Sequence, residues 1–131
     1  MRRTKLVRIV IRAICELMRY EVIVWLCGPG SVKRQLSRQP RSVADGPASH
    51  ELERDICEAV LLATCFYWKP VLCLQRSVCA VRLLRKHGIA ARLVVGYRPV
   101  PFFSHAWVEV DGRVVNCSPV YKQRLRLLYT A

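Results

Sequence analysis

The last third of the sequence constrains the fold more than any other part. "ARLVVGYR" (91–98) is rich in β-branched and aromatic residues and is followed by two prolines that interrupt a strand. "HAWVEV" (105–110) and "RVVNCS" (113–118) have the same character, and Asp111-Gly112 joins them with a dipeptide typical of a tight hairpin turn. These segments predict an antiparallel sheet.

The sequence before this sheet is mainly helical in pattern. Apolar residues recur at helical spacing in 5–27, in 49–68 and from 73 up to Gly88. We expect Ser49 to be the N-cap of the second helix and Gly88 to end the third. Helices followed by an antiparallel sheet indicate an α+β fold.

The length of 131 residues suits one domain with its own core, and we predict that residues 1–131 form a single domain. Residues 1–69 would be a helical part, and residues 70–131 the core that carries the chemistry. The segment 28–48 is polar, basic and contains Gly and Pro, so that we expect a linker or a surface loop there.

One polar stripe runs along the first helix: Arg8, Arg12, Glu16 and Arg19. These charges and Glu21 leave no uncharged apolar run of about 20 residues, which a membrane span needs. We therefore interpret residues 1–27 as an amphipathic helix with a wide buried face. The alternative is a helix that lies on a membrane or in a partner's groove, as basic amphipathic helices do.

The net charge of +13 favours acidic partners. However, no basic run is interleaved with aromatic residues, and no zinc-finger or RNA-binding signature is present, so that we predict no nucleic-acid partner.

The seven cysteines are odd in number, include no CxxC pair and follow no secretory signal. Reduced thiols in a cytoplasmic protein are therefore expected rather than a disulfide framework. Neither the cysteines nor the three histidines have the short spacings of a zinc site, and we predict no metal.

Cys73 and His105 could together carry chemistry. Cys73 opens a helix, where unpaired backbone N–H groups and the helix dipole favour a thiolate and can receive an oxyanion. His105 begins a strand that would pack against that helix, so that it could accept the thiol proton and return it to a leaving amine. The plainer alternatives are a buried structural thiol and a histidine half-buried under Trp107.

"CLQRSVCAVRLLRKHGIAARLVVGYR" (73–98) followed by "HAWVEVDGRVVN" (105–116) closely resembles the transglutaminase-like leader peptidase of lasso-peptide biosynthesis, of the microcin J25 maturation type, in its short stand-alone form. The resemblance covers about residues 70–131. It implies a papain-like core in which a helix bearing Cys73 packs on a small sheet bearing His105. Cys73 would be the nucleophile and His105 the general acid and base, with no cofactor.

The resemblance also implies the substrate and the partners. Such enzymes remove the leader from a ribosomally made lasso precursor peptide. A small leader-binding recognition-element protein delivers the precursor, and an ATP-dependent cyclase then closes the freed N-terminus onto an acidic side chain. We name Trp68, Gln75 and Trp107, which lie close to the two candidates in the sequence, as substrate-binding candidates.

The family's third catalytic member is an Asp on the strand after the hairpin turn, and it aligns with Cys117. A thiol is a poor orienter for imidazole, because it accepts hydrogen bonds weakly and is uncharged at neutral pH. Three readings remain: a Cys–His dyad, a triad completed by Asn116 in the way of papain-like enzymes, or an impaired module that only binds a peptide or protein partner.

The hairpin register decides which residue faces His105. A two-residue loop pairs Val110 with Arg113 and sets Ser118 opposite His105. Asn116 would then lie on the same face as the histidine, one pair along.

A three-residue loop instead pairs Glu109 with Arg113 and sets Cys117 directly opposite His105. Because Cys117 aligns with the family's Asp, we favour this second register.

Overall fold

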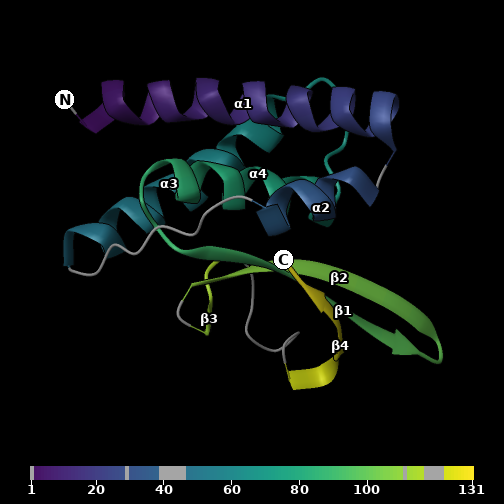
Figure 1. Ribbon diagram of the computed structural model, residues 1–131. Coiled ribbons are helices and arrows are strands. Elements are labelled where there is room, and N and C mark those ends of the chain that lie inside the picture. The colour runs from purple at the N-terminus through teal and green to yellow at the C-terminus, as the bar shows by residue number, and fades with distance from the viewer. Residues whose placement is uncertain (1, 29, 39–46, 111, 117–122) are drawn as a thin grey trace.

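The computed structural model describes residues 2–28, 30–38, 47–110, 112–116 and 123–131 (Figure 1). In these ranges the helices are α1 (Arg2–Cys27), α2 (Gly30–Arg38), α3 (Pro47–Phe66) and α4 (Cys73–Lys86). The strands are β1 (Ala91–Pro99), β2 (Phe102–Val110), β3 (Arg113–Val114) and β4 (Arg126–Thr130). They form one antiparallel sheet in the order β3-β2-β1-β4, which confirms the α+β prediction.

The elements form three layers, with α4 in the middle (Figure 1). The long helix α1 lies outermost on one side, and the sheet lies on the other. No helix in the described ranges is long and apolar enough to cross a membrane.

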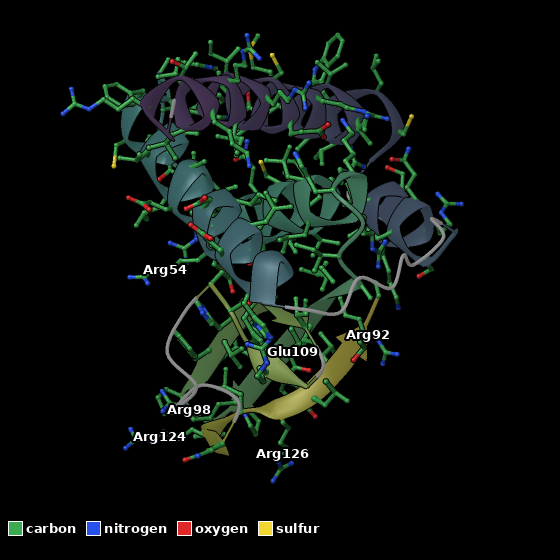
Figure 2. The ribbon with its side chains drawn as sticks, turned by 90° about the vertical axis from the view of Figure 1, so that its left-hand side faces the viewer. Arg54, Arg92, Arg98, Glu109, Arg124 and Arg126 are labelled. Carbon is green, nitrogen blue, oxygen red and sulfur yellow. The ribbon has the colours of Figure 1, made fainter. Side chains whose placement is uncertain are left out.

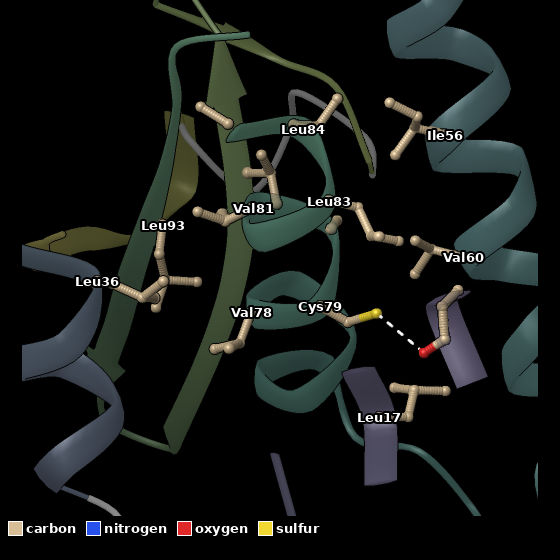
Figure 3. Packing of buried hydrophobic residues seen from close by; sticks show 14 of the residues in the cluster. Leu17, Leu36, Ile56, Val60, Val78, Cys79, Val81, Leu83, Leu84 and Leu93 are labelled. Atoms are coloured by element: carbon tan, nitrogen blue, oxygen red, sulfur yellow. Dashed lines mark hydrogen bonds between the residues drawn. The ribbon is translucent and has the colours of Figure 1, made fainter. Parts of the chain in front are cut away.

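One hydrophobic core joins the layers around α4 (Figure 3). Val78 and Val81 point toward the sheet, and Leu83 lies on the side of α3. On the side of α1, the Cys79 thiol is buried and donates to the carbonyl oxygen of Ala13 at 3.4 Å. Because α4 is covered on all these sides, its position relative to the sheet is fixed.

Gly88 ends α4 as expected. Its φ of +83° is a conformation that glycine adopts without strain. Its N–H donates to the carbonyl of Arg85, and the N–H of Ile89 donates to that of Leu84. This pair of bonds is a Schellman motif, and it turns the chain directly into β1.

Three expectations about the helices are wrong. The segment 28–48 contains the helix α2. α3 begins at Pro47, so that Ser49 lies within its first turn and is not its N-cap. It ends at Phe66 instead of Trp68.

The polar composition of residues 28–48 predicts a loop, although part of this segment forms α2. Val32 and Leu36 are spaced by four residues and are buried at 3% and 0% exposure. These are the two apolar side chains that the described part of α2 contributes to the core, so that its apolar signal in the sequence is weak.

The prediction of a single polar stripe along α1 is also wrong. Glu16 is 4% exposed and is paired with Arg82 and Lys86 of α4. A glutamate that lies one turn from exposed arginines points inward, because the buried Arg82 and the exposed Lys86 of α4 provide its cationic partners.

Candidate functional site

Cys73 is the first residue of α4, as the sequence predicts. The preceding residue, Leu72, is extended (φ −77°, ψ 162°), and no side chain caps the helix. Cys73 itself is half-buried. The first backbone N–H groups of α4 are therefore not bonded by a capping side chain, which is the arrangement that can receive an anion or an oxyanion.

The first turns of α4 lie against β2 beside His105. Ser77, one turn after Cys73, is fully buried and its hydroxyl donates to the carbonyl oxygen of Ala106 at 3.1 Å. Ser77, on the same helical face as Cys73, thus contacts the middle of β2 at Ala106.

α4 and β2 run in the same direction. The position of Cys73 along the helix axis can therefore be compared with the positions of residues along β2. Arg85, eight residues after Ser77, bonds the carbonyl of Ala91, and Ala91 pairs with Val110. A helix rises about 1.5 Å per residue, so that Cys73 lies about 6 Å before Ser77 along the axis. At about 3.4 Å per strand residue, this is the level of the first half of β2, where His105 lies.

His105 lies in a row of aromatic side chains on β2. Its ring stacks with those of Phe103 and Trp107, at centroid distances of 6.4 and 6.2 Å. Gly96 is its partner on β1, and a Cβ there would come within 2.7 Å of the Trp107 ring. Gly96 therefore leaves room for the tryptophan that supports His105.

Burial lowers the pKa of His105, and the positive charge of Arg76 lowers it further. Both effects disfavour the imidazolium. At neutral pH the ring is therefore neutral and can accept a proton.

The observed hairpin register is the two-residue one: Val110 pairs with Arg113, and Glu109 with Val114. Gly112 has a φ of +76°, as a tight hairpin turn requires. The register that we favoured, with Glu109 opposite Arg113, is wrong. Cys117 lies outside the described residues.

Asn116 connects β2 to α4. Its Oδ1 accepts a hydrogen bond from the N–H of Val108 at 2.8 Å, and its Nδ2 donates to the Ser77 hydroxyl at 3.1 Å. The side-chain amide thus takes the place of a strand carbonyl at the edge of β2. Asn116 and Ser77 form a hydrogen-bonded link between the helix of Cys73 and the strand of His105.

The three substrate-binding candidates have different environments. Trp68 is 76% exposed. Trp107 is buried, and its indole N–H donates to Glu109. Gln75 is buried and donates to the carbonyl of Leu17 on α1, so that it fixes α4 to α1 and does not face solvent.

A cavity of about 560 Å³ lies between α3, α4 and β3. Arg76 and Asn116 line it, and so do Arg54, Cys57 and Glu58. Burial, and secondly Glu53, raise the pKa of Cys57 to about 12, so that this thiol is no competing nucleophile at neutral pH. Sequence reasoning missed Arg76, Ser77 and this cavity, although both residues stand in the motif "CLQRS".

Arginines surround the sheet end of the molecule. Figure 2 shows Arg98, Arg124 and Arg126 projecting outward there, and Arg92 next to Glu109. Arg92 and Glu109 are direct partners on β1 and β2. In the described ranges, no group of three His, Cys, Asp or Glu side chains could hold a metal ion.

Comparisons with known proteins give one family and one curated relative. The chain matches the transglutaminase-like superfamily over residues 14–130. A curated relative, the Microcin J25-processing protein McjB of Escherichia coli, is 43% identical over 56 residues, which are 43% of this chain and 27% of that protein. The chain thus matches about a quarter of the length of this relative. A search of the solved structures gave no significant match.

Proposed function

This chain belongs to the transglutaminase-like superfamily, and on that premise we propose that it is a cysteine peptidase that removes the leader from a ribosomally made lasso-peptide precursor. The partial likeness to McjB, which processes microcin J25 by its name, supports this substrate class. The observation that carries the proposal is the Ser77–Ala106 bond, since it ties the helix that begins at Cys73 to the strand residue next to His105.

In the proposed reaction, the Cys73 sulfur attacks the carbonyl carbon of the scissile peptide while His105 accepts the thiol proton. Backbone N–H groups at the start of α4 hydrogen-bond the oxyanion. The C–N bond then breaks, and His105 returns the proton to the leaving amine of the core peptide. Water, deprotonated by His105, hydrolyses the thioester, releases the leader and restores the thiol.

The lowered pKa of His105 supports its role as the base. A neutral imidazole can take the first proton without a prior deprotonation step. Arg76, which contributes to this shift, lines the cavity beside α4, where we propose that part of the substrate lies.

We propose that a separate leader-binding protein delivers the precursor and that a cyclase acts on the freed core. Cleavage by the chain alone would then be slow and would rise sharply with the leader-binding protein, through effective concentration. We place this reaction in the cytoplasm, where thiols are kept reduced.

The decisive experiment incubates the chain with the precursor and its leader-binding protein and follows the masses of the products. We expect one cut that separates leader from core, and no cut with Cys73→Ala. Cys79→Ala, a change to a buried thiol of the same helix, is the matched control for loss of a cysteine. Full cleavage by the Cys73→Ala variant would remove Cys73 as the nucleophile.

A module that binds a peptide without cutting it is the second candidate, because Cys117 stands where the family has an Asp. If residue 117 is the orienting position, Cys117→Asp raises the cleavage rate, by up to the order of 10⁴ that an orienter contributes in serine proteases. An unchanged rate would exclude position 117 from this role. Binding of the precursor without any cut, in both forms, would favour the non-catalytic module.

A further inference from the structure

The outer face of α1 exposes a row of apolar side chains. The outer stripe consists of Val7, Ile11, Cys15, Met18, Val22 and Trp25. Its five large members are 53–84% exposed, and Trp25 is the most exposed of them. The opposite face of the same helix fills the core with Ile9, Ala13 and Leu17. α1 is therefore apolar on two faces, and only one of them is covered within the described part of the chain.

The spacing of the stripe shows that it is one continuous ridge. From Val7 to Trp25 its members follow one another at intervals of four, four, three, four and three residues. Such intervals keep the side chains on one side of a helix over several turns. The 26 residues of α1 extend over about 39 Å, and the helix forms the outermost layer of the molecule along this length (Figure 1).

The exposed charges beside the stripe are positive. Arg8, Arg12 and Arg19 are exposed and lie one residue from stripe members. The two acidic residues of α1 are engaged elsewhere: Glu16 is buried against α4, and Glu21 bonds Tyr67 and Lys69. A surface of opposite charge would therefore complement the outer face of α1.

Exposed aromatic side chains extend the ridge near its C-terminal half. The bonds of Glu21 to Tyr67 and Lys69 hold the end of α3 alongside this part of α1. Phe66 and Trp68, on either side of Tyr67, are 75% and 76% exposed. Trp25 and Trp68 are of the kind of side chain that is enriched at membrane–water interfaces, and Phe66 adds exposed apolar surface.

A second copy of the chain fits this ridge poorly. Paired antiparallel along the stripe, two copies would bring Arg12 and Arg19 of one helix toward the same arginines of the other. The net charge of +13 adds long-range repulsion between copies. A partner helix normally lies in a groove, whereas α1 presents a convex ridge.

We propose that the outer face of α1 docks flat on an anionic lipid surface. The stripe enters the boundary between headgroups and acyl chains, and the flanking arginines bind the headgroups. A planar and deformable surface can contact a convex helix along its whole length. This site is separate from Cys73 and His105, and the inference does not depend on the peptidase activity.

The test is cosedimentation of the full chain with vesicles. Equal parts of phosphatidylcholine and phosphatidylglycerol form the anionic vesicles, and phosphatidylcholine alone forms the neutral ones. We expect binding to the anionic vesicles that weakens as salt is raised, and weaker binding to the neutral ones. A chain that does not sediment with anionic vesicles would overturn the proposal.

Two sets of variants separate the apolar and the charged contributions. Ile11→Gln, Met18→Gln and Val22→Gln together should weaken binding about a hundredfold or more, because three apolar side chains no longer enter the lipid. Arg8→Gln or Arg12→Gln should each weaken it about fivefold, the factor that corresponds to about 1 kcal/mol per basic residue. Circular dichroism checks that each variant folds.

The matched control changes three apolar side chains at the sheet end of the molecule, Val100→Gln, Leu127→Gln and Leu128→Gln, which are 57–85% exposed. It should bind as the unchanged chain does. Equal binding by the α1 triple variant would reject the stripe as the contact. Two other results would assign the stripe to a protein contact. The first is a dimer in light scattering that becomes a monomer in the α1 triple variant. The second is an α1 triple variant that no longer binds the leader-binding protein but still binds the vesicles.

Discussion

The C-terminal half of α4 is fixed by buried ionic and hydrogen bonds, whereas its N-terminal end has no capping side chain. Arg85 is 7% exposed and donates to the carbonyl oxygens of Leu36, Ala91 and Ala131. Arg82 is 2% exposed and bonds Gln35 and Glu16.

At the other end of α4, Leu72 is 74% exposed, and Cys73 starts the helix without a side-chain cap. One helix can thus stabilise the fold through its C-terminal half and leave its N-terminal end available for chemistry. The arginines tie the C-terminal half of α4 to α1, α2 and β1, so that the fold does not require a capping side chain on the first N–H groups of the helix. The first N–H groups can then stay available for a substrate. The predictions below test this division, from the largest expected effect to the smallest.

The largest difference should be in thiol reactivity. A low dose of iodoacetamide near pH 6.5 should label Cys73 first, because only an activated thiolate reacts there. Cys79 should stay unlabelled, since burial, and secondly Glu16, raise its pKa. Peptide mapping by mass spectrometry gives the rate at each site. The exposed Cys15, Cys27 and Cys65 are internal controls, and labelling of Cys73 no faster than theirs would contradict the division.

The anchored end should dominate stability. Arg85→Met leaves three buried carbonyl oxygens without their charged donor and should lower the free energy of unfolding by about 3–5 kcal/mol. Urea unfolding measures this change. Arg92→Met, at an exposed position of β1, should change stability by less than about 0.5 kcal/mol. Similar losses in both variants would show that α4 is not anchored through Arg85.

The link between the two regions should affect both properties. Ser77→Ala removes the donor to Ala106 and the acceptor of Asn116, so that stability should fall by about 1–3 kcal/mol. We also expect about a tenfold lower kcat with little change in KM, because in the proposed reaction Ser77 positions the helix that carries Cys73 against the strand that carries His105.

Ser31→Ala is the matched control, since Ser31 also donates to one backbone carbonyl, that of Gly28, but far from the site. It should lower stability without lowering kcat. An unchanged kcat in Ser77→Ala would mean that Ser77 only stabilises the fold.

The smallest effect should come from Arg76→Gln. Removing this positive charge raises the pKa of His105 toward its usual value, so that the imidazole becomes protonated at a higher pH. The acid limb of kcat/KM should therefore move to higher pH, with an activity a few-fold lower near pH 6 and unchanged near pH 8. Arg92→Gln should leave the limb in place. If Arg76→Gln leaves the acid limb of the kcat/KM profile in place, Arg76 does not influence the pKa of His105.

The strong local signals of the sequence predicted the centre of the fold. The breaks before Cys73 and at Gly88 bound α4 almost to the residue, because proline and left-handed glycine act within their own turn. The Asp111-Gly112 dipeptide predicted the hairpin, and Cys73 stands at a helix start as expected. The α+β class followed from the order of these elements.

The errors concern features that depend on distant partners. The sequence does not predict α2, because two apolar residues four positions apart, Val32 and Leu36, do not by themselves indicate a buried helix face. The core that buries them comes from other parts of the chain. The predicted register is wrong because it follows the position of Cys117 in the resemblance, whereas Asp-Gly favours the two-residue turn that pairs Val110 with Arg113. The roles of Gln75 and Asn116 could not be predicted, since their bonding partners lie 58 and 39 residues away.

The sequence by itself determined the bounds of α4, the start of β1 and the end of β2, and which two residues are candidates for chemistry; β2 begins at Phe102, three residues before the predicted start at His105. Turn residues and periodicity act locally, and no tertiary contact is needed to read them. The tertiary structure alone decided which of the two apolar faces of α1 is covered, and that Glu16 points inward. It also decided that Asn116 joins β2 to α4. The reason is physical: a side chain's environment is set by the elements packed around it, and these come from remote parts of the chain.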